Sequence, residues 1–345
     1  MNKLIVSSIL GCAALFAEAG HVELFVEQGV TEDATHFNTV QAAFDAAQTN
    51  GGDADITIAP GTYVEKVSLT SSPNTKIHAS SENPKSTVIS YNAASSTINP
   101  STGEGYGTDG SATFTIGNYN GGVEIEGITI ENTAGADAGQ AVALIVYGYG
   151  RTAIFRRCRI TGYQDTLETK NGLSYFEDCY IAGSVDFIFG GNPTLFNRCE
   201  IHAMRNGAKV TACAHDETNS VGYLFWKCRV TAEDGVTCNL GRAWYAGANV
   251  WWVDCDFGSA VESNMWESWN QESGKTDYRV YGCRADTEFA PESWTDGILT
   301  TGTVDDFWKA MAGFGYTSIL DIYSSSEYTS YSSFRPTIRP GVVIR

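Results

Sequence analysis

The chain has little positive charge. Its 22 lysines and arginines are outnumbered by 40 aspartates and glutamates, so the formal net charge is −18 and the pI is near 4.6. A nucleic-acid-binding protein needs a basic surface for the phosphates, and this composition excludes that class. Histidine is also scarce, and the five histidines do not occur at metal-ligand spacing. They are His21, His36, His78, His202 and His215.

Long hydrophobic runs are missing outside the N-terminus. There, Lys3 is followed by a mostly apolar run from Leu4 to Phe16 and by Ala17-Glu18-Ala19, a small-x-small cleavage site. We therefore expect residues 1–19 to be a secretory signal peptide, with a buried N-terminal strand or acylation at Cys12 as alternatives. No other segment approaches the ~18 apolar residues of a membrane span. The sequence thus predicts a soluble, extracellular protein with no membrane partner.

Helical periodicity is rare. After Asp55 the chain consists of short apolar runs separated by Gly, Asn, Asp and Ser, which indicates many strands joined by tight turns. One short helix is expected from Phe37 to Gln48, capped by Asn38 or Thr39, where it would cover the open end of a stack of strands. The next helical pattern begins at Val304.

A change of composition marks the C-terminus. Residues 321–345 are rich in serine and tyrosine, and their basic end carries Arg335, Arg339 and Arg345. We therefore expect an extended or partly disordered tail. Residues 20–320 are expected to form one all-β domain.

A cysteine repeat decides among the all-β folds. The pattern aromatic-x-x-Cys-x-aliphatic occurs at Phe155–Ile160 and Phe176–Ile181, and the cysteines of the repeat follow one another at intervals of 21, 20, 29, 27 and 28 residues. Its cysteines are Cys158, Cys179, Cys199, Cys228, Cys255 and Cys283. Such intervals are typical of the coils of a parallel β-helix, whereas a propeller blade needs about 40 residues or more.

Stacked cysteines would have nearly parallel Cα–Cβ bonds, which suits a disulfide poorly. We therefore favour a ladder of buried thiols over bridges between the six. Cys213 and Cys238 lie off the pattern and are the expected bonded pair.

The repeat brings two aspartates into the same register. Asp165 lies seven residues after Cys158, and Asp186 lies seven residues after Cys179. Neighbouring strands are about 4.8 Å apart, so the two carboxyl groups would be close neighbours. Two carboxylates at that distance cannot both ionise easily, and one is expected to stay protonated. The alternative is a structural aspartate stack bonded to backbone amides.

Two amides and one cation complete the candidate site. Gln164 adjoins Asp165, and Gln140 lies 25 residues before Asp165, about one coil earlier. Neutral amides can donate to a developing oxyanion, although a glutamine ladder between coils would look the same. Arg242 could hold one aspartate ionised, or could belong to a surface ion pair.

Five segments resemble the pectin methylesterase family, in the order the family uses. They are Gly61-Thr62-Tyr63-Val64-Glu65, Gly139-Gln140-Ala141-Val142-Ala143-Leu144, Tyr163-Gln164-Asp165-Thr166-Leu167, Gly183-Ser184-Val185-Asp186-Phe187-Ile188-Phe189-Gly190 and Leu240-Gly241-Arg242-Ala243-Trp244. The resemblance covers about residues 39–283. It implies a right-handed parallel β-helix and a secreted carboxylic ester hydrolase that removes methyl esters from homogalacturonan, giving pectate and methanol.

The resemblance also implies roles. Asp186 would be the nucleophile, and Asp165 the acid that protonates methanol and then the base that activates water. Gln140 and Gln164 would form the oxyanion site, and Arg242 would hold Asp186. The residues expected to bind substrate are Trp244, Phe189, Val185 and Thr113, with Trp266 and Trp269 as further groove candidates. Neither a metal nor another cofactor is implied.

One departure from the family is visible, because Ala243 stands where the family usually has proline. We expect a monomer whose partners are methyl-esterified pectin and water. The alternatives are a polysaccharide lyase or glycosidase on the same fold, a non-catalytic β-helix, and a hydrolase of another ester or a thioester.

Overall fold

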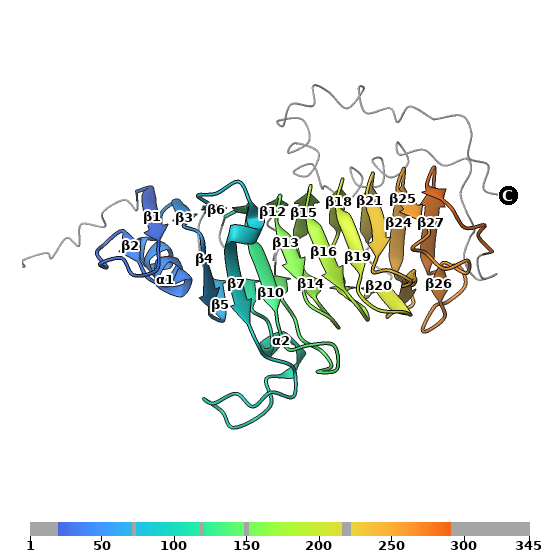
Figure 1. The fold of residues 1–345 in the computed structure, drawn as a ribbon, viewed down its shortest axis with the longest axis horizontal. Helices are drawn as coiled ribbons and strands as arrows, with labels where there is room; N and C mark the ends of the chain where they lie inside the picture. The colour runs from blue at the N-terminus through green and yellow to red at the C-terminus, as the bar shows by residue number, and fades with distance from the viewer. Residues whose placement is uncertain (1–19, 71–73, 118–120, 148–151, 216–221, 291–345) are drawn as a thin grey trace, which may run out of the picture.

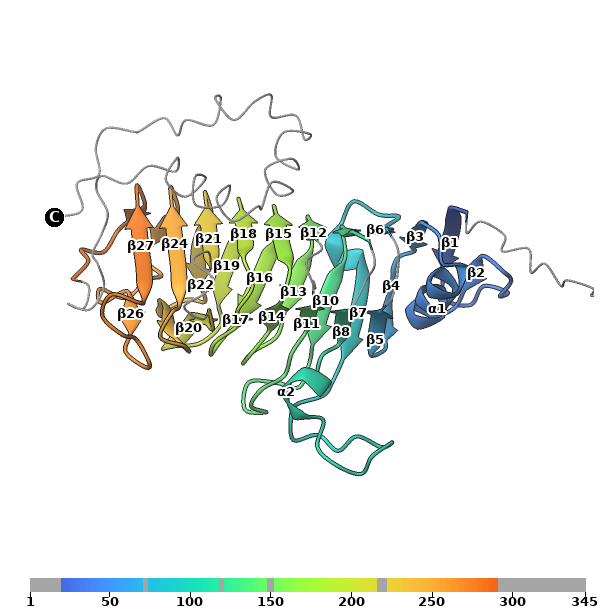
Figure 2. The same ribbon diagram turned by 180° about the vertical axis from the view of Figure 1, so that it is seen from behind.

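Each coil of the chain contributes one short strand to each of three parallel sheets. The computed structural model describes residues 20–70, 74–117, 121–147, 152–215 and 222–290. Over these ranges, strands from successive coils pair in parallel, and the coils stack from β1 to β27 along one axis (Figures 1 and 2). The sequence prediction of a parallel β-helix is confirmed.

Within the described residues, the sheets hold eleven, nine and eight strands. Sheet A contains, in spatial order, β2 (His36–Phe37), β1 (Val22–Val26), β3 (Ala54–Ile58), β6 (Thr75–Ala79), β9 (Val123–Glu126), β12 (Thr152–Arg156), β15 (Leu173–Glu177), β18 (Thr194–Asn197), β21 (Tyr223–Trp226), β24 (Asn249–Val253) and β27 (Asp277–Tyr281). Sheet B contains β28 (Arg284–Ala285), β25 (Asp256–Gly258), β22 (Arg229–Ala232), β19 (Glu200–Ala203), β16 (Tyr180–Gly183), β13 (Arg159–Thr161), β10 (Thr129–Asn132), β7 (Thr87–Tyr91) and β4 (Gly61–Val64). Sheet C contains β26 (Trp266–Glu267), β23 (Cys238–Ala243), β20 (Ala208–Cys213), β17 (Ile188–Gly190), β14 (Leu167–Lys170), β11 (Leu144–Tyr147), β8 (Phe114–Gly117) and β5 (Val67–Thr70).

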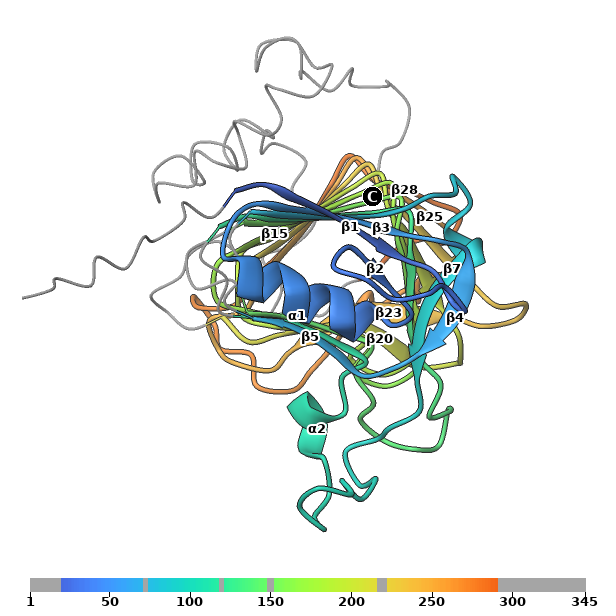
Figure 3. The same cartoon turned by 90° about the vertical axis from the view of Figure 1, so that its left-hand side faces the viewer.

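A helix lies across the N-terminal end of the stack (Figure 3). This is α1 (Val40–Asn50), which begins after Thr39, whose hydroxyl accepts from the Ala42 amide, and ends at Gly51 in the left-handed conformation. Its apolar face is buried against the first coils, so it covers strand edges that would otherwise be open. The short helices η1 (Pro84–Ser86) and α2 (Gly107–Gly110) lie in connections. No helix in the described ranges is long and apolar enough to cross a membrane.

The turn from sheet A to sheet B is a single residue with a positive φ. Arg157, Asp178, Arg198, Lys227 and Asp254 occupy it with φ between 50° and 56°. The residue after each is a cysteine of the repeat, whose thiol points inward. Each thiol donates to a carbonyl oxygen of the preceding coil, for example from Cys179 to Phe155 at 3.5 Å. Each of these cysteines therefore marks the corner at which the chain passes from sheet A to sheet B.

All eight cysteines in the described ranges are free and buried. The six repeat cysteines form the thiol ladder that the sequence predicted, and burial raises the pKa of the thiols of Cys158 and Cys179 well above the usual value. The predicted bond between Cys213 and Cys238 is wrong. Cys238 pairs with Ala208, whereas Cys213 pairs with Ala243, so the two cysteines lie at opposite ends of neighbouring strands.

The predictions of the signal peptide (1–19), the helical pattern at Val304 and the tail (321–345) lie outside the described residues. The described ranges between residues 20 and 290 share the same three sheets.

An aromatic stack runs through the core beside the thiols. Phe155, Phe176, Phe196, Phe225 and Trp252 follow one another on adjacent strands of sheet A, with ring centroids 3.8–5.1 Å apart. Interplanar angles of 5–13° show that the rings are nearly parallel. Aromatic pairs add stability beyond the area that they bury.

Truncating the centre of this stack should be costly. Phe196→Ala is expected to lower the free energy of unfolding by about 3–5 kcal/mol, because it removes a fully buried ring and leaves a cavity between two others. Phe25→Ala, at an exposed ring, is the matched control and should change it little. Urea unfolding followed by circular dichroism measures both. Equal losses for the two variants would contradict a continuous stacked core.

Candidate active site

The two aspartates of the predicted pair occupy the same position in neighbouring coils. Asp165 precedes β14 and Asp186 precedes β17, and two residues later Leu167 pairs with Ile188. The Asp165 amide donates to the Val185 carbonyl oxygen at 3.0 Å, which ties the two turns together. Both aspartates have a left-handed backbone, with φ of 61° and 52°. Side chains with Cβ rarely adopt this conformation, so strain is stored at the turns that present the carboxyl groups.

Arg242 holds Asp186 through a bidentate contact. Its Nε donates to Asp186 Oδ1 at 2.9 Å and its Nη2 donates to Oδ2 at 2.7 Å. The contact raises the pKa of the guanidinium, and a paired guanidinium favours the carboxylate form of Asp186. The sequence prediction that Arg242 pairs with one aspartate matches this geometry, and β23 runs through Ala243 without a proline.

The position before Arg242 must be glycine. Gly241 has φ of 152°, and a Cβ there would lie 1.9 Å from Thr211 Oγ1 on the paired strand. Close approach of the two backbones therefore places the guanidinium next to the coil of Asp186.

A second acid fixes the other side of Arg242. Arg242 Nη1 donates to Glu267 Oε1 at 2.9 Å, and Glu267 Oε2 lies 2.8 Å from Lys209 Nζ. Burial acts in the opposite direction, yet Lys209 and Arg242 hold the pKa of Glu267 below its usual value. The guanidinium carbon of Arg242 lies over the ring of Trp269, 4.4 Å from the ring centroid. Arg242 is thus confined on three sides, and the sequence analysis missed Glu267 and Lys209.

Asp165 is in the opposite electrostatic situation. It is only 9% exposed, and burial, followed by repulsion from Asp186 and Glu168, raises its pKa to about 8. Arg242 and the Gln164 side chain act against this shift but are outweighed. At neutral pH Asp165 is therefore protonated and lies beside the Asp186 carboxyl group that Arg242 contacts, an arrangement that suits an acid next to a nucleophile.

Glu168 is a buried acid that no sequence motif indicated. It is 1% exposed, its Oε1 lies 2.6 Å from Lys170 Nζ, and its Oε2 has no hydrogen-bond partner in the structure. Burial raises its pKa to about 7 against the effect of Lys170. In sheet C its neighbours are Ile145 and Phe189, so apolar side chains flank it on both adjacent strands.

Gln140 and Gln164 lie side by side. They form an isolated parallel bridge, and the Ala141 amide donates to the Gln164 carbonyl oxygen at 3.1 Å. Both side chains are partly exposed, and Gln164 immediately precedes Asp165. The structure thus places Gln164 on the coil of Asp165 and Gln140 on the coil next to it.

The predicted substrate contacts divide into two groups. Trp244 and Val185 are partly exposed, and Trp244 packs on Phe189 and Tyr245, with centroids 6.1 and 5.6 Å apart. Phe189 is almost entirely covered and would act mainly as support for Trp244. Trp269 is exposed beside Arg242, as a groove residue should be.

Two other expectations about the groove are wrong. Thr113 is fully buried, and its hydroxyl donates inward to the Glu131 carbonyl oxygen at 2.9 Å. Trp266 is also buried, because its ring packs in the core against Tyr278, with centroids 4.4 Å apart.

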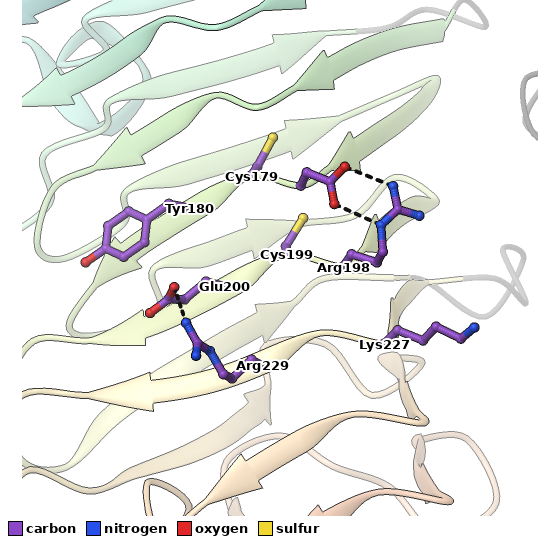
Figure 4. A pocket seen from close by; sticks show the side chains of 8 residues that line it. Cys179, Tyr180, Arg198, Cys199, Glu200, Lys227 and Arg229 are labelled. Atoms are coloured by element: carbon purple, nitrogen blue, oxygen red, sulfur yellow. Dashed lines mark hydrogen bonds and ion pairs between the residues drawn. The ribbon is translucent and has the colours of Figure 1, made fainter. Parts of the chain in front are cut away.

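A separate pocket lies at the corner between sheets A and B (Figure 4). Its charged side chains are mostly paired, with Arg198 on Asp178 and Arg229 on Glu200. The two candidate acids precede strands of sheet C instead, so this pocket does not belong to their site. Among the described residues, no group of three or more His, Cys, Asp or Glu side chains is placed to hold a metal ion.

Comparison with known proteins places the chain in a family. The Pectinesterase family model matches residues 28–286. The chain belongs to the pectinesterase family. Pectinesterase QRT1 of Arabidopsis thaliana is 34% identical over 261 residues, covering 71% of this chain and 66% of that protein. Pectinesterase 31 of the same plant is 32% identical, covering 66% of this chain and 73% of that protein.

Solved structures of pectin methylesterases share the fold. The enzyme from carrot has a TM-score of 0.68 and 26% identity, covering 87% of this chain and 92% of that chain. A pectin methylesterase in complex with a hexasaccharide has a TM-score of 0.69 and 24% identity, covering 82% and 94%. Membership of the pectinesterase family therefore rests on sequence and fold together.

Proposed function

We propose that this protein hydrolyses the methyl esters of homogalacturonan to give pectate and methanol, through an acyl-enzyme on Asp186. The observation that supports this most is the division of charge between two adjacent acids. Arg242 contacts both carboxyl oxygens of Asp186 at 2.7 and 2.9 Å, while burial and the neighbouring negative charges raise the pKa of Asp165 to about 8. A nucleophile and an acid are thus ready at the same pH.

In the first half-reaction, an Asp186 oxygen attacks the ester carbonyl carbon, and negative charge develops on the carbonyl oxygen. The side-chain N–H groups of Gln140 and Gln164 donate to that oxygen. Asp165 gives its proton to the methoxy oxygen as the carbon–oxygen bond breaks, and methanol leaves. An anhydride between Asp186 and the galacturonosyl acyl group remains, and Asp165 is now a carboxylate.

In the second half-reaction, Asp165 takes a proton from water while the water oxygen attacks the acyl carbonyl carbon. The bond to Asp186 breaks, and Asp186 leaves as a carboxylate beside Arg242. The product acid then ionises in solution. Both aspartates return to their starting protonation states, so each cycle consumes one water and releases one methanol.

The proposal includes a setting for the reaction. We propose that residues 1–19 direct the chain out of the cell as a signal peptide, that the protein acts as a monomer, and that the partly exposed Trp244 and the exposed Trp269 pack on sugar rings. Stacking on sugars suits aromatic rings that keep one face in water.

The direct test is methanol release from highly methylated pectin by the full chain, with and without EDTA, together with an assay for chain cleavage. The proposal predicts equal methanol with and without chelator, one new carboxylate per methanol, and no new chain ends. Unsaturated or reducing ends without methanol would indicate a lyase or glycosidase. Hydrolysis of an acyl thioester but not of pectin would indicate another substrate.

Glu168 offers a test of the electrostatics. Glu168→Gln removes a negative charge that raises the pKa of Asp165, while an amide oxygen can still accept from Lys170. We expect the alkaline fall in kcat/KM to begin at lower pH than in the parent, because Asp165 then loses its proton more easily. The pH dependence of methanol release measures it, and an unchanged or upward-shifted alkaline limb would contradict the role.

A further inference from the structure

Among the described residues, no hydrogen bond from its own coil orients the side-chain amide of Gln140. Gln140 precedes β11 on a turn, and its side chain is partly exposed. An oxyanion donor must present its NH₂ group and turn its carbonyl oxygen away, yet a glutamine side chain can adopt either orientation unless a partner distinguishes them. Something outside the coil must therefore select the productive orientation.

Ser95 is placed to do this. Its hydroxyl donates to Gln140 Oε1 at 3.0 Å, and its backbone amide donates to the Gln140 carbonyl oxygen at 2.8 Å. The first contact occupies the amide oxygen of Gln140 and leaves its NH₂ group for another acceptor. The second fixes the backbone from which the side chain extends. Two contacts from one residue thus fix both ends of Gln140.

Ser95 belongs to the long connection between β7 and β8, which we call the 92–113 segment. It contains α2 and extends away from the stack on the side of sheet C (Figures 1 and 3). A segment that projects in this way can position a catalytic amide only if its base is rigid.

The base of the 92–113 segment is held by two side chains from the stack. The amide of Asn132, 3% exposed, donates to the carbonyl oxygens of Ala93 at 2.8 Å and Ser111 at 3.2 Å, and so ties the two ends of the segment together. It also donates to the Val142 carbonyl oxygen, two residues after Gln140. Lys66 Nζ donates to the Gly110 carbonyl oxygen at 2.7 Å and to that of Ala112.

The helix α2 of the segment is attached as well. Lys170 Nζ donates to both carboxylate oxygens of Asp109 at 2.9 and 2.8 Å, and Tyr147 donates to the same carboxylate. Lys170 is the residue that also contacts Glu168. The segment is therefore fixed at its base and at α2 by residues of the stack.

We propose that Ser95 is a positioning residue for catalysis, which selects the orientation of the Gln140 amide in which its N–H groups face the developing oxyanion. This rests on the proposed esterase function and deepens it by naming what aims the donor. Ser95 itself touches no reacting atom. Its effect should therefore pass entirely through Gln140, and it should change the chemical step more than substrate binding.

The experiment is a double-mutant cycle on methanol release. Ser95→Ala is expected to lower kcat about 10-fold with KM nearly unchanged, as is usual for an outer partner of a catalytic group. Ser95→Thr, which keeps the hydroxyl, should restore kcat to within about twofold of the parent, and Ser96→Ala, at an exposed neighbour, should be neutral. Gln140→Ala should cost about 10²–10³ in kcat. In that background Ser95→Ala should have no further effect, whereas in Gln164→Ala it should keep its full effect.

The outcomes separate the two claims. If Gln140→Ala leaves kcat unchanged, the oxyanion role in the proposed function fails. If Gln140→Ala is slow but Ser95→Ala is not, or if the Ser95→Ala loss persists undiminished without Gln140, the positioning role fails. Thermal unfolding of each variant is followed in parallel, and a kcat loss that tracks a loss of folded protein and is not restored by Ser95→Thr also overturns the proposal.

Discussion

Replacing Asp186 by asparagine is expected to lower methanol release by about 10⁴-fold or more, the scale seen when an enzyme nucleophile is removed. A neutral amide is a poor nucleophile, while its shape lets Arg242 keep one hydrogen bond. Asparagine also tolerates the left-handed backbone at this position, where φ is 52°. The substitution therefore removes the chemistry with little change in geometry. Initial rates on methylated pectin measure the effect.

Asp178→Asn is a matched control for that variant. Asp178 also has φ of 52° and also accepts a bidentate contact, from Arg198 at 2.8 and 2.9 Å, but it lies at the corner between sheets A and B. It should keep the parent rate. A similar loss in both variants would mean that the left-handed turns matter for folding only, and Asp186→Asn activity within tenfold of the parent would exclude Asp186 as nucleophile.

Asp165→Asn is expected to lower kcat by about 10²–10⁴, because methanol then leaves without a proton donor and water attacks the acyl-enzyme without a base. The variant should also change the pH profile. In the parent, kcat/KM should fall as pH rises past about 8, where Asp165 loses its proton. In Asp165→Asn this alkaline limb should disappear, since the group that titrates is gone. Persistence of the same limb in the variant would assign it to another group.

The stability of the Asp165→Asn variant provides an independent check. A carboxyl group whose folded-state pKa is raised contributes stability below its unfolded pKa of about 4, and that contribution is lost as pH rises through the folded value near 8. Asparagine does not titrate, so the variant should be more stable than the parent above pH 8. Lower stability at that pH would mean that the carboxyl group is not under electrostatic strain.

The parts of the fold that repeat could be predicted from the sequence. Each coil places a small thiol at the same corner, so the spacing of Cys158 and Cys179 reports the register of the strands, and the register brings Asp165 beside Asp186. The helix at Val40–Asn50 could also be predicted, because its cap at Thr39 and its glycine stop are local signals. The register of the strands and the ends of the helix could thus be predicted, because both depend on periodic or local sequence features.

What could not be predicted depends on the direction of single side chains. Glu168 and Lys170 alternate with Leu167 and Thr169 like the outward residues of a half-buried strand, and only the neighbouring coil shows that Phe189 covers Glu168. The same applies to Thr113, which turns inward at a corner of the coil. Sequence alternation gives a face of the strand, but not what covers that face.

Contacts between neighbouring coils were equally hidden. Ser95 meets Gln140 across 45 residues from a connection, and Glu267 meets Arg242 across 25 as its register partner in sheet C. The sequence spacing indicated neither pair, because the connections between strands differ in length from coil to coil. The pairing of Cys213 with Ala243 failed to follow from the sequence for the same reason.

The central claim is that one acid of the pair is protonated while its neighbour is charged. Infrared difference spectra of the free enzyme across a pH titration, compared among the parent, Asp165→Asn and Asp186→Asn, test this most directly. We predict a component of the protonated carboxyl band that disappears near pH 8, above the step near pH 7 that comes from Glu168, and that is absent from Asp165→Asn. Loss of the band near the ordinary carboxyl pKa, or its absence from Asp186→Asn with retention in Asp165→Asn, would contradict the assignment of nucleophile and acid.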